Sequence, residues 1–127
     1  MDDINLSIPA KPEYILVARL TTSAIASRID FCMNDIEDLK VAVAEACIIL
    51  MNVEDSINKL NITFKIHEHK ALTIDINLRD IPLYGDLKEN EENELGLFIL
   101  KSLMDTTEIK TKNNQVYGIS MHKKCGG

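Results

Sequence analysis

Apolar residues recur along this chain with two different periods, and each period predicts a different kind of element. Segment 12–28, PEYILVARLTTSAIASR, has apolar residues at helical spacing and begins with Pro12, which suits the first turn of a helix. A second helix is predicted from Asn34 to about Val53; its first half is amphipathic and its second half, ACIILM, is apolar on every side. Segment 94–104, ELGLFILKSLM, is the third predicted helix.

Alternation of apolar and polar residues predicts strands in the rest of the chain. Five segments show it fully or weakly: 4–9, 61–67, 72–80, 106–112 and 115–122. The tetrapeptide HEHK and the pair Asn113–Asn114 are predicted hairpin turns. The resulting order, β-α-α-β-β-α-β-β, predicts an α+β fold. We expect a two-layer sandwich, with a mixed, mostly antiparallel sheet and three helices on one face.

Composition narrows the class of protein. The chain has 127 residues, which suits one domain, 1–127, and its formal net charge of −6 argues against a nucleic-acid surface. No apolar run approaches the roughly 18 residues of a membrane span, and the N-terminus MDDINLSIP lacks the basic start of a signal peptide. Cys32, Cys47 and Cys125 have no C-x-x-C spacing, which favours reduced thiols and a cytoplasmic protein.

One acid, Glu45, stands in the otherwise apolar stretch VAVAEACIILMN, residues 41–52. Four residues later, where a helix would place a partner on the same face, the chain has Ile49. Glu45 is therefore either the remnant of an active site or a surface residue at the edge of a buried helix.

Three strings resemble a known family: IPAKPEYILVARLTTSAIASRI, IEDLKVAVAEAC and LGLFILKSLMD. They are similar to RsbW/SpoIIAB-type anti-sigma factors, serine-protein kinases on the GHKL, or Bergerat, ATPase fold, and the resemblance runs from Ile4 to His122. It implies a GHKL-like fold and a homodimer that binds a sigma factor or an anti-sigma antagonist. It also implies ATP with Mg²⁺, provided that the family's motifs are intact.

The family's helix motif, E-x-x-x-N, is only half present. Glu45 matches the acid, which the resemblance identifies as the general base, whereas Ile49 replaces the asparagine that would ligate Mg²⁺. An isoleucine cannot ligate a hard cation, which requires oxygen. Asn52 lies on the same face of the helix but about 4.5 Å further along the axis, which makes it a poor substitute.

The family's adenine motif, D-x-G, is matched by Asp80-Ile81-Pro82. Asp80 keeps the phase of its strand, whereas Pro82 replaces the flexible glycine and has no N–H to donate. In an alternative register, the strand ends at Leu78 and the aspartate is lost altogether.

The family's phosphate motif, G-x-G, reads Glu94-Leu95-Gly96 at the start of the predicted third helix. Gly96 is retained, but Glu94 would put a negative charge where phosphate would lie. The preceding loop, the family's ATP lid, is acidic over 86–94, and Gly118 replaces a threonine that supports the adenine aspartate.

These departures predict a binding protein without a cofactor. Phosphoryl transfer depends on positioning and on metal-assisted stabilisation of charge, which Glu45 alone cannot supply. The first hypothesis is an anti-sigma factor-like partner-switching regulator that sequesters its partner. The alternatives are a working serine-protein kinase that uses ATP–Mg²⁺, and a general scaffold with neither role.

The predicted first helix has more apolar residues than packing on one sheet face requires. Leu16, Leu20 and the intervening Arg19 form a candidate partner site, unless the surplus packs on the second helix. His67 and His69 are better explained by a solvated hairpin than by a metal site, because no further ligand is near them in sequence. The acidic run 86–94 is either a solvated loop or a surface for a basic partner.

Overall fold

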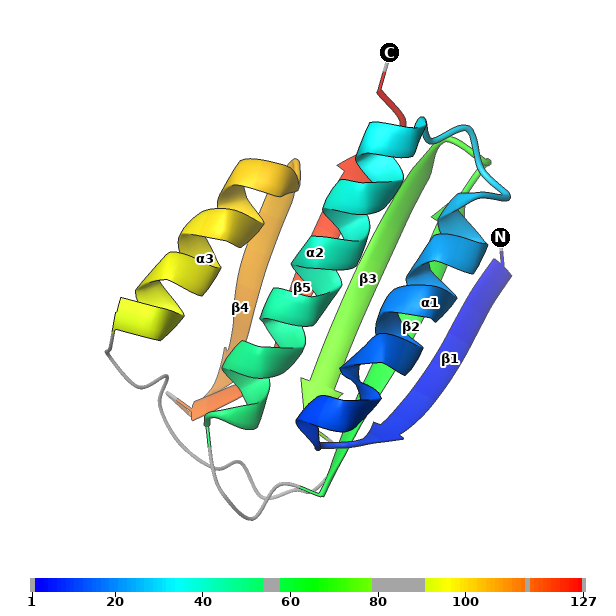
Figure 1. The fold of residues 1–127 in the computed structure, drawn as a ribbon. Coiled ribbons are helices and arrows are strands. Elements are labelled where there is room, and N and C mark those ends of the chain that lie inside the picture. The colour runs from blue at the N-terminus through cyan, green and yellow to red at the C-terminus, as the bar shows by residue number, and fades with distance from the viewer. Residues whose placement is uncertain (1, 54–57, 79–90, 114, 127) are drawn as a thin grey trace.

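The structure is a computed structural model, and it describes residues 2–53, 58–78, 91–113 and 115–126. Its helices are η1 (Pro12–Tyr14), α1 (Ile15–Ala26), α2 (Met33–Met51) and α3 (Glu91–Leu103). Its strands are β1 (Asp2–Pro9), β2 (Lys59–His67), β3 (Ala71–Leu78), β4 (Thr106–Lys112) and β5 (Gln115–Lys124). The predicted α+β class and the order of elements are confirmed (Figure 1). Within the described ranges, no helix combines the length and apolarity that crossing a membrane requires.

The five strands form one sheet in the order β1-β2-β3-β5-β4. All four of these pairings are antiparallel, so the mixed character that we predicted is absent from the described strands. The hairpin between β2 and β3 turns at Glu68 and His69, both at positive φ (52° and 60°), as a tight type I′ turn requires. Lys70 N–H closes this turn on the carbonyl of His67 at 2.9 Å.

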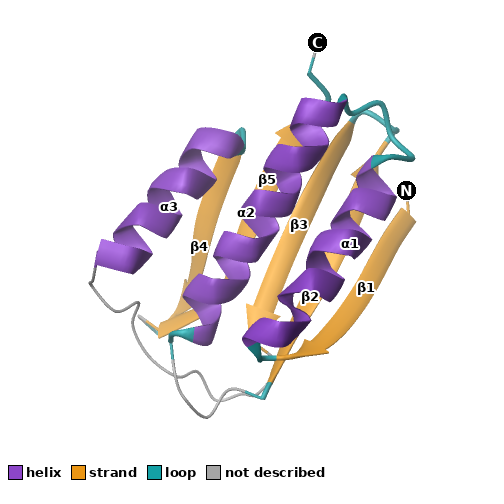
Figure 2. Cartoon of the chain, in the orientation of Figure 1, coloured by secondary structure: helices purple, strands orange, loops and turns teal. Residues whose placement is uncertain are grey.

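The three α-helices lie on one face of the sheet, as predicted, and α2 is the central one (Figure 2). Successive side chains of a strand point to opposite faces of the sheet, and this alternation decides which of them face the helices. In β2 and β3 every second residue is buried under the helices: Leu60, Ile62, Phe64, Leu72, Ile74, Ile76 and Leu78. Ile119 and Met121 of β5 continue this layer. The core is therefore a layer of apolar side chains, which lies between the β-sheet and helices α1 and α2.

The other face of the sheet is polar, and its centre is an ion-pair network. Asp75 on β3 is paired with Lys65 on β2 at 3.3 Å and with Lys110 on β4 at 3.7 Å. Partial burial alone would raise the pKa of Asp75. A hydrogen bond with Ser120 and the charges of Lys110 and Lys65 outweigh it, so the pKa lies below its ordinary value.

Asp75→Asn is expected to lower the free energy of unfolding at pH 7 by about 1 kcal/mol, because two lysines lose their shared partner. The depressed pKa makes the carboxylate stabilising above the unfolded-state pKa, and this contribution is lost as the pH falls through the folded-state pKa. Urea denaturation at pH 7 and at progressively lower pH checks this. A difference between variant and wild type that does not shrink in acid would contradict it.

Candidate functional site

The candidate site centres on α2, which carries Glu45 and Ile49 one turn apart. Glu45 is half-buried and makes no hydrogen bond or ion pair within the described part of the chain. Ile49 is 1% exposed and belongs to the main hydrophobic core. The two side chains share one face of α2, and that face is turned toward α3.

Gly96 on α3 is where the two helices meet. A Cβ built on Gly96 would lie 3.0 Å from Ile49 Cδ1 and 3.3 Å from Glu45 Oε2. The glycine thus lets α3 approach α2 closely, and the isoleucine fills the space between them. The structure therefore brings together three of the residues singled out from the sequence, and they form a closed helix–helix contact.

The sheet beneath α2 is apolar. The inward side chains of β3 and β5 are aliphatic, among them Ile74, Ile76 and Ile119. Asp75, the described acid of β3, points to the opposite face. Asp80 and Pro82 lie outside the described residues, which reach Leu78 in β3.

The structure adds two details to the expected nucleotide motifs, at Glu94 and at Gly118. Helix α3 begins at Glu91 rather than Glu94, so Glu94 is exposed within the first turns of the helix and not at its end. Gly118 pairs with Asn77, and a Cβ on it would overlap Asn77 Oδ1 and lie 2.9 Å from Lys110 Cε. Because Lys110 lies on the polar face of the sheet, a side chain at position 118 would point away from α2.

Comparison with known proteins places the chain in a family. A family described as "Histidine kinase-like ATPase domain" matches residues 8–121. "Serine-protein kinase RsbW" of Bacillus velezensis is 33% identical, over 100% of this chain and 88% of the relative. The RsbW kinase of Bacillus subtilis is 32% identical, over 99% of this chain and 88% of the relative. The chain belongs to the RsbW family of histidine kinase-like ATPases.

An ATPase domain of the RsbW type implies that ATP is bound together with Mg²⁺. The described residues do not suit the binding of ATP with Mg²⁺. The position expected to ligate the metal is Ile49, whose terminal carbons lie against Gly96. Of the three described atoms nearest to a Cβ on Gly96, one is an oxygen, Glu45 Oε2, and a hard cation bridging phosphates requires several oxygens. Asn52, the other candidate, is the C-cap residue that follows the end of α2 at Met51.

The outward face of α1 is apolar, and it does not pack on α2. Leu16 and Leu20 are each 58% exposed and Val17 is 41% exposed, whereas the buried side of α1 is formed by Ala18, Thr22, Ile25 and Ala26. The alternative that the apolar surplus packs on the second helix is therefore wrong. Arg19 lies between the exposed leucines; its Nε is buried and has no hydrogen-bond partner in the described part of the chain.

The histidines form a pair that the sequence did not reveal. His69 is exposed in the turn, while His67 Nε2 and His122 Nδ1 both lie 2.9 Å from Thr73 Oγ1 on the polar face of the sheet. Cross-strand register, which sequence spacing cannot supply, brings His122 next to His67. Among the residues described, no group of three or more His, Cys, Asp or Glu side chains could hold a metal ion.

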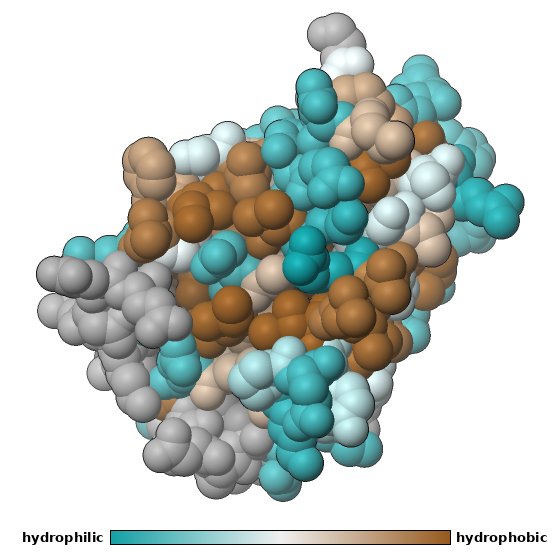
Figure 3. Space-filling view, in the orientation of Figure 1, coloured by the Kyte–Doolittle hydropathy of each residue, from teal (hydrophilic) through white to brown (hydrophobic). Residues whose placement is uncertain are grey.

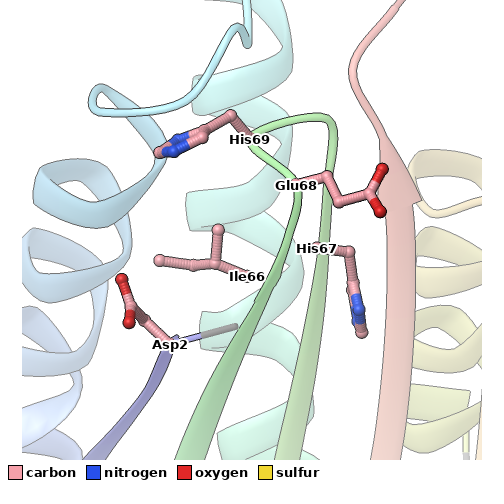
Figure 4. Close-up of a pocket in the computed structure, with 5 residues that line it drawn as sticks. All are labelled: Asp2, Ile66, His67, Glu68 and His69. Atoms are coloured by element: carbon pink, nitrogen blue, oxygen red, sulfur yellow. The ribbon is translucent and has the colours of Figure 1, made fainter.

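An open cavity of about 370 Å³ lies at the β2–β3 hairpin, lined by Asp2, Ile66, His67, Glu68 and His69. Figure 4 shows these side chains spread around the turn, with His67 and Ile66 on opposite faces of β2. The hairpin is at the end of the sheet that is remote from the start of α3 (Figure 1). The cavity is thus separate from the Glu45–Ile49–Gly96 contact.

Proposed function

We propose that this chain is an anti-sigma factor-like, partner-switching regulator that acts by sequestering a protein and does not phosphorylate it. The observation that carries the proposal is the closed contact of Ile49 with Gly96. Phosphoryl transfer requires a metal-bound nucleotide held in a fixed position, and an aliphatic side chain occupies the expected metal position. The relatives are named serine-protein kinases, and this chain would have diverged from that activity.

In this proposal the family's nucleotide residues are vestigial. Glu45 would be a former general base, and Asp80 and Gly96 would be remnants of the adenine and phosphate sites. Gly96 would now serve packing, because any larger residue would press on Ile49. The protein would need neither a cofactor nor a metal ion.

The partner would be a sigma factor, an anti-sigma antagonist, or each in turn, bound in the cytoplasm by a homodimer. The exposed Leu16 and Leu20 of α1, with the partly buried Arg19 between them, support this choice of surface. Two leucines that are each more than half exposed are costly to leave in water. An arginine between them adds the directional hydrogen bonds typical of interface anchors.

The alternative remains an active serine-protein kinase that uses ATP–Mg²⁺ to phosphorylate an antagonist. Two observations favour it: Glu45 is present at the position of the general base, and the relatives carry the kinase name. Under this alternative, nucleotide binding would have to open the contact between α2 and α3.

We expect no saturable binding when ADP with Mg²⁺ is titrated into the protein in a calorimeter, because no described side chain replaces the missing metal ligand. An RsbW kinase from one of the Bacillus relatives, titrated in the same buffer, is the positive control. An affinity in the low micromolar range would defeat the proposal and support the kinase alternative, since it would show that α2 and α3 separate to admit the nucleotide.

A further inference from the structure

The outer surface of the helix layer carries a second apolar area, distinct from the one on α1. Val41 of α2 is 39% exposed, and Leu95 and Phe98 of α3 are 60% and 69% exposed. Figure 3, seen from the helix side, shows apolar surface over α3 and again over α1. We call Val41, Glu45, Leu95 and Phe98 the α2–α3 surface. Exposed aromatic and leucine side chains of this size are typical of protein interaction sites.

The carboxylate of Glu45 lies where α2 and α3 meet within this surface. Glu45 is one helical turn from Val41, and its Oε2 lies 3.3 Å from the point where a Cβ of Gly96 would be. Leu95 adjoins Gly96 in the chain, and Phe98, three residues after Leu95, shares the exposed side of α3 with it. Glu45 is half-buried and has no ionic partner among the described residues. A half-buried carboxylate at the contact between two helices that both carry exposed apolar side chains is suited to receive a cation from outside the molecule.

The charged residues around this surface also favour a positively charged partner. Asp38 precedes Val41 by one turn on α2, and Glu94 adjoins Leu95 on α3; both are acidic. The described bases are Lys40, which adjoins Val41 but is paired with Glu37 at 3.2 Å, and Lys101 on α3. The chain as a whole has a net charge of −6. Complementarity therefore favours a basic partner over an acidic one.

We propose that the α2–α3 surface binds a protein segment that presents an arginine or lysine between apolar side chains, as one face of a basic amphipathic helix does. The cation would pair with Glu45, and the apolar side chains would cover Phe98, Leu95 and Val41. The former catalytic acid would then serve as a recognition residue. This deepens the proposed function and rests on it in one respect, namely that the chain acts by binding proteins. It adds a second surface to the one on α1.

The probe is a fluorescein-labelled synthetic amphipathic helix whose leucine face is bordered by arginines, with a counterpart in which glutamate replaces each arginine. Anisotropy should show saturable binding of the arginine peptide, and amide chemical shifts should map it to Val41, Glu45 and Phe98. Glu45→Gln, which keeps the shape of the side chain, and Phe98→Ser should each weaken binding about tenfold.

The matched control is Glu108→Gln, which removes the same charge from the exposed part of β4 and should change the affinity by less than about twofold. Equal losses in Glu108→Gln and Glu45→Gln, or binding of the glutamate peptide, would overturn the proposal. So would chemical shifts that map to α1, or a change of Phe98→Ser from dimer to monomer, which would identify a second copy as the occupant. The variants of Arg19 and Leu20, which the Discussion uses to test the proposed function, lie on α1 and leave the α2–α3 surface unchanged, so the two proposals can fail separately.

Discussion

Ile49→Asn is expected to lower the free energy of unfolding by about 3–5 kcal/mol and to confer neither ADP binding nor phosphate transfer. Ile49 is 1% exposed and contacts Gly96 across the α2–α3 packing, so an amide at this position loses aliphatic burial and is buried with hydrogen-bonding groups that Glu45, one turn away, satisfies only in part. Restoring the family's asparagine would supply one metal ligand of several. Groups that act as a unit in catalysis are not restored one at a time.

Urea denaturation and an assay of phosphate transfer to a candidate antagonist together check this prediction. Ile49→Val is the conservative control and should cost about 1 kcal/mol. Val41→Asn puts the same polar group on the exposed side of the same helix, where Val41 is 39% exposed, and should change stability by less than about 0.5 kcal/mol. Robust phosphate transfer by Ile49→Asn would show that the replacements at Pro82 and Glu94 matter less than we infer.

Hydrophobic periodicity was sufficient to predict the helices, the strands and the face that each strand buries. The alternation of Ile62, Phe64 and Ile66 correctly predicted both a strand and its inward side chains, because a one-residue shift would expose all of them. The start of α3 was predicted three residues too late. Glu91 and Glu92 make that segment read as part of an acidic loop, although acids are also favoured in the first turn of a helix.

Contacts between strands that are not consecutive could not be predicted in this way. The proximity of His67 to His122, and of Asp75 to Lys110, depends on β5 lying between β3 and β4. The contact between Gly96 and Ile49 depends likewise on how α3 packs on α2. Sequence motifs therefore indicated which residues of the family's site had changed. The structure was needed to show that the changed residue, Ile49, contacts the retained Gly96 and fills the space between two helices.

The double variant Arg19→Glu, Leu20→Ala is expected to weaken capture of the partner by at least about 100-fold, because it removes an apolar anchor and reverses a charge at the centre of the proposed α1 surface. The partners to test are a sigma factor and an anti-sigma antagonist from the same organism. Leu20 is 58% exposed, so its truncation should leave the circular dichroism melt unchanged. Surface plasmon resonance with the immobilised partner measures the effect.

Arg28→Glu is the matched control, since it makes the same charge reversal on an exposed residue two positions beyond the end of α1. It should bind the partner within about threefold of wild type, because a charge outside the contact acts mainly through long-range steering. Leu20→Ala alone should account for a loss of about tenfold, which separates the apolar contribution from the charge. Undiminished capture by the double variant would show that partner binding does not depend on the α1 surface. A monomer in light scattering of the wild type would show that the protein does not form the proposed homodimer.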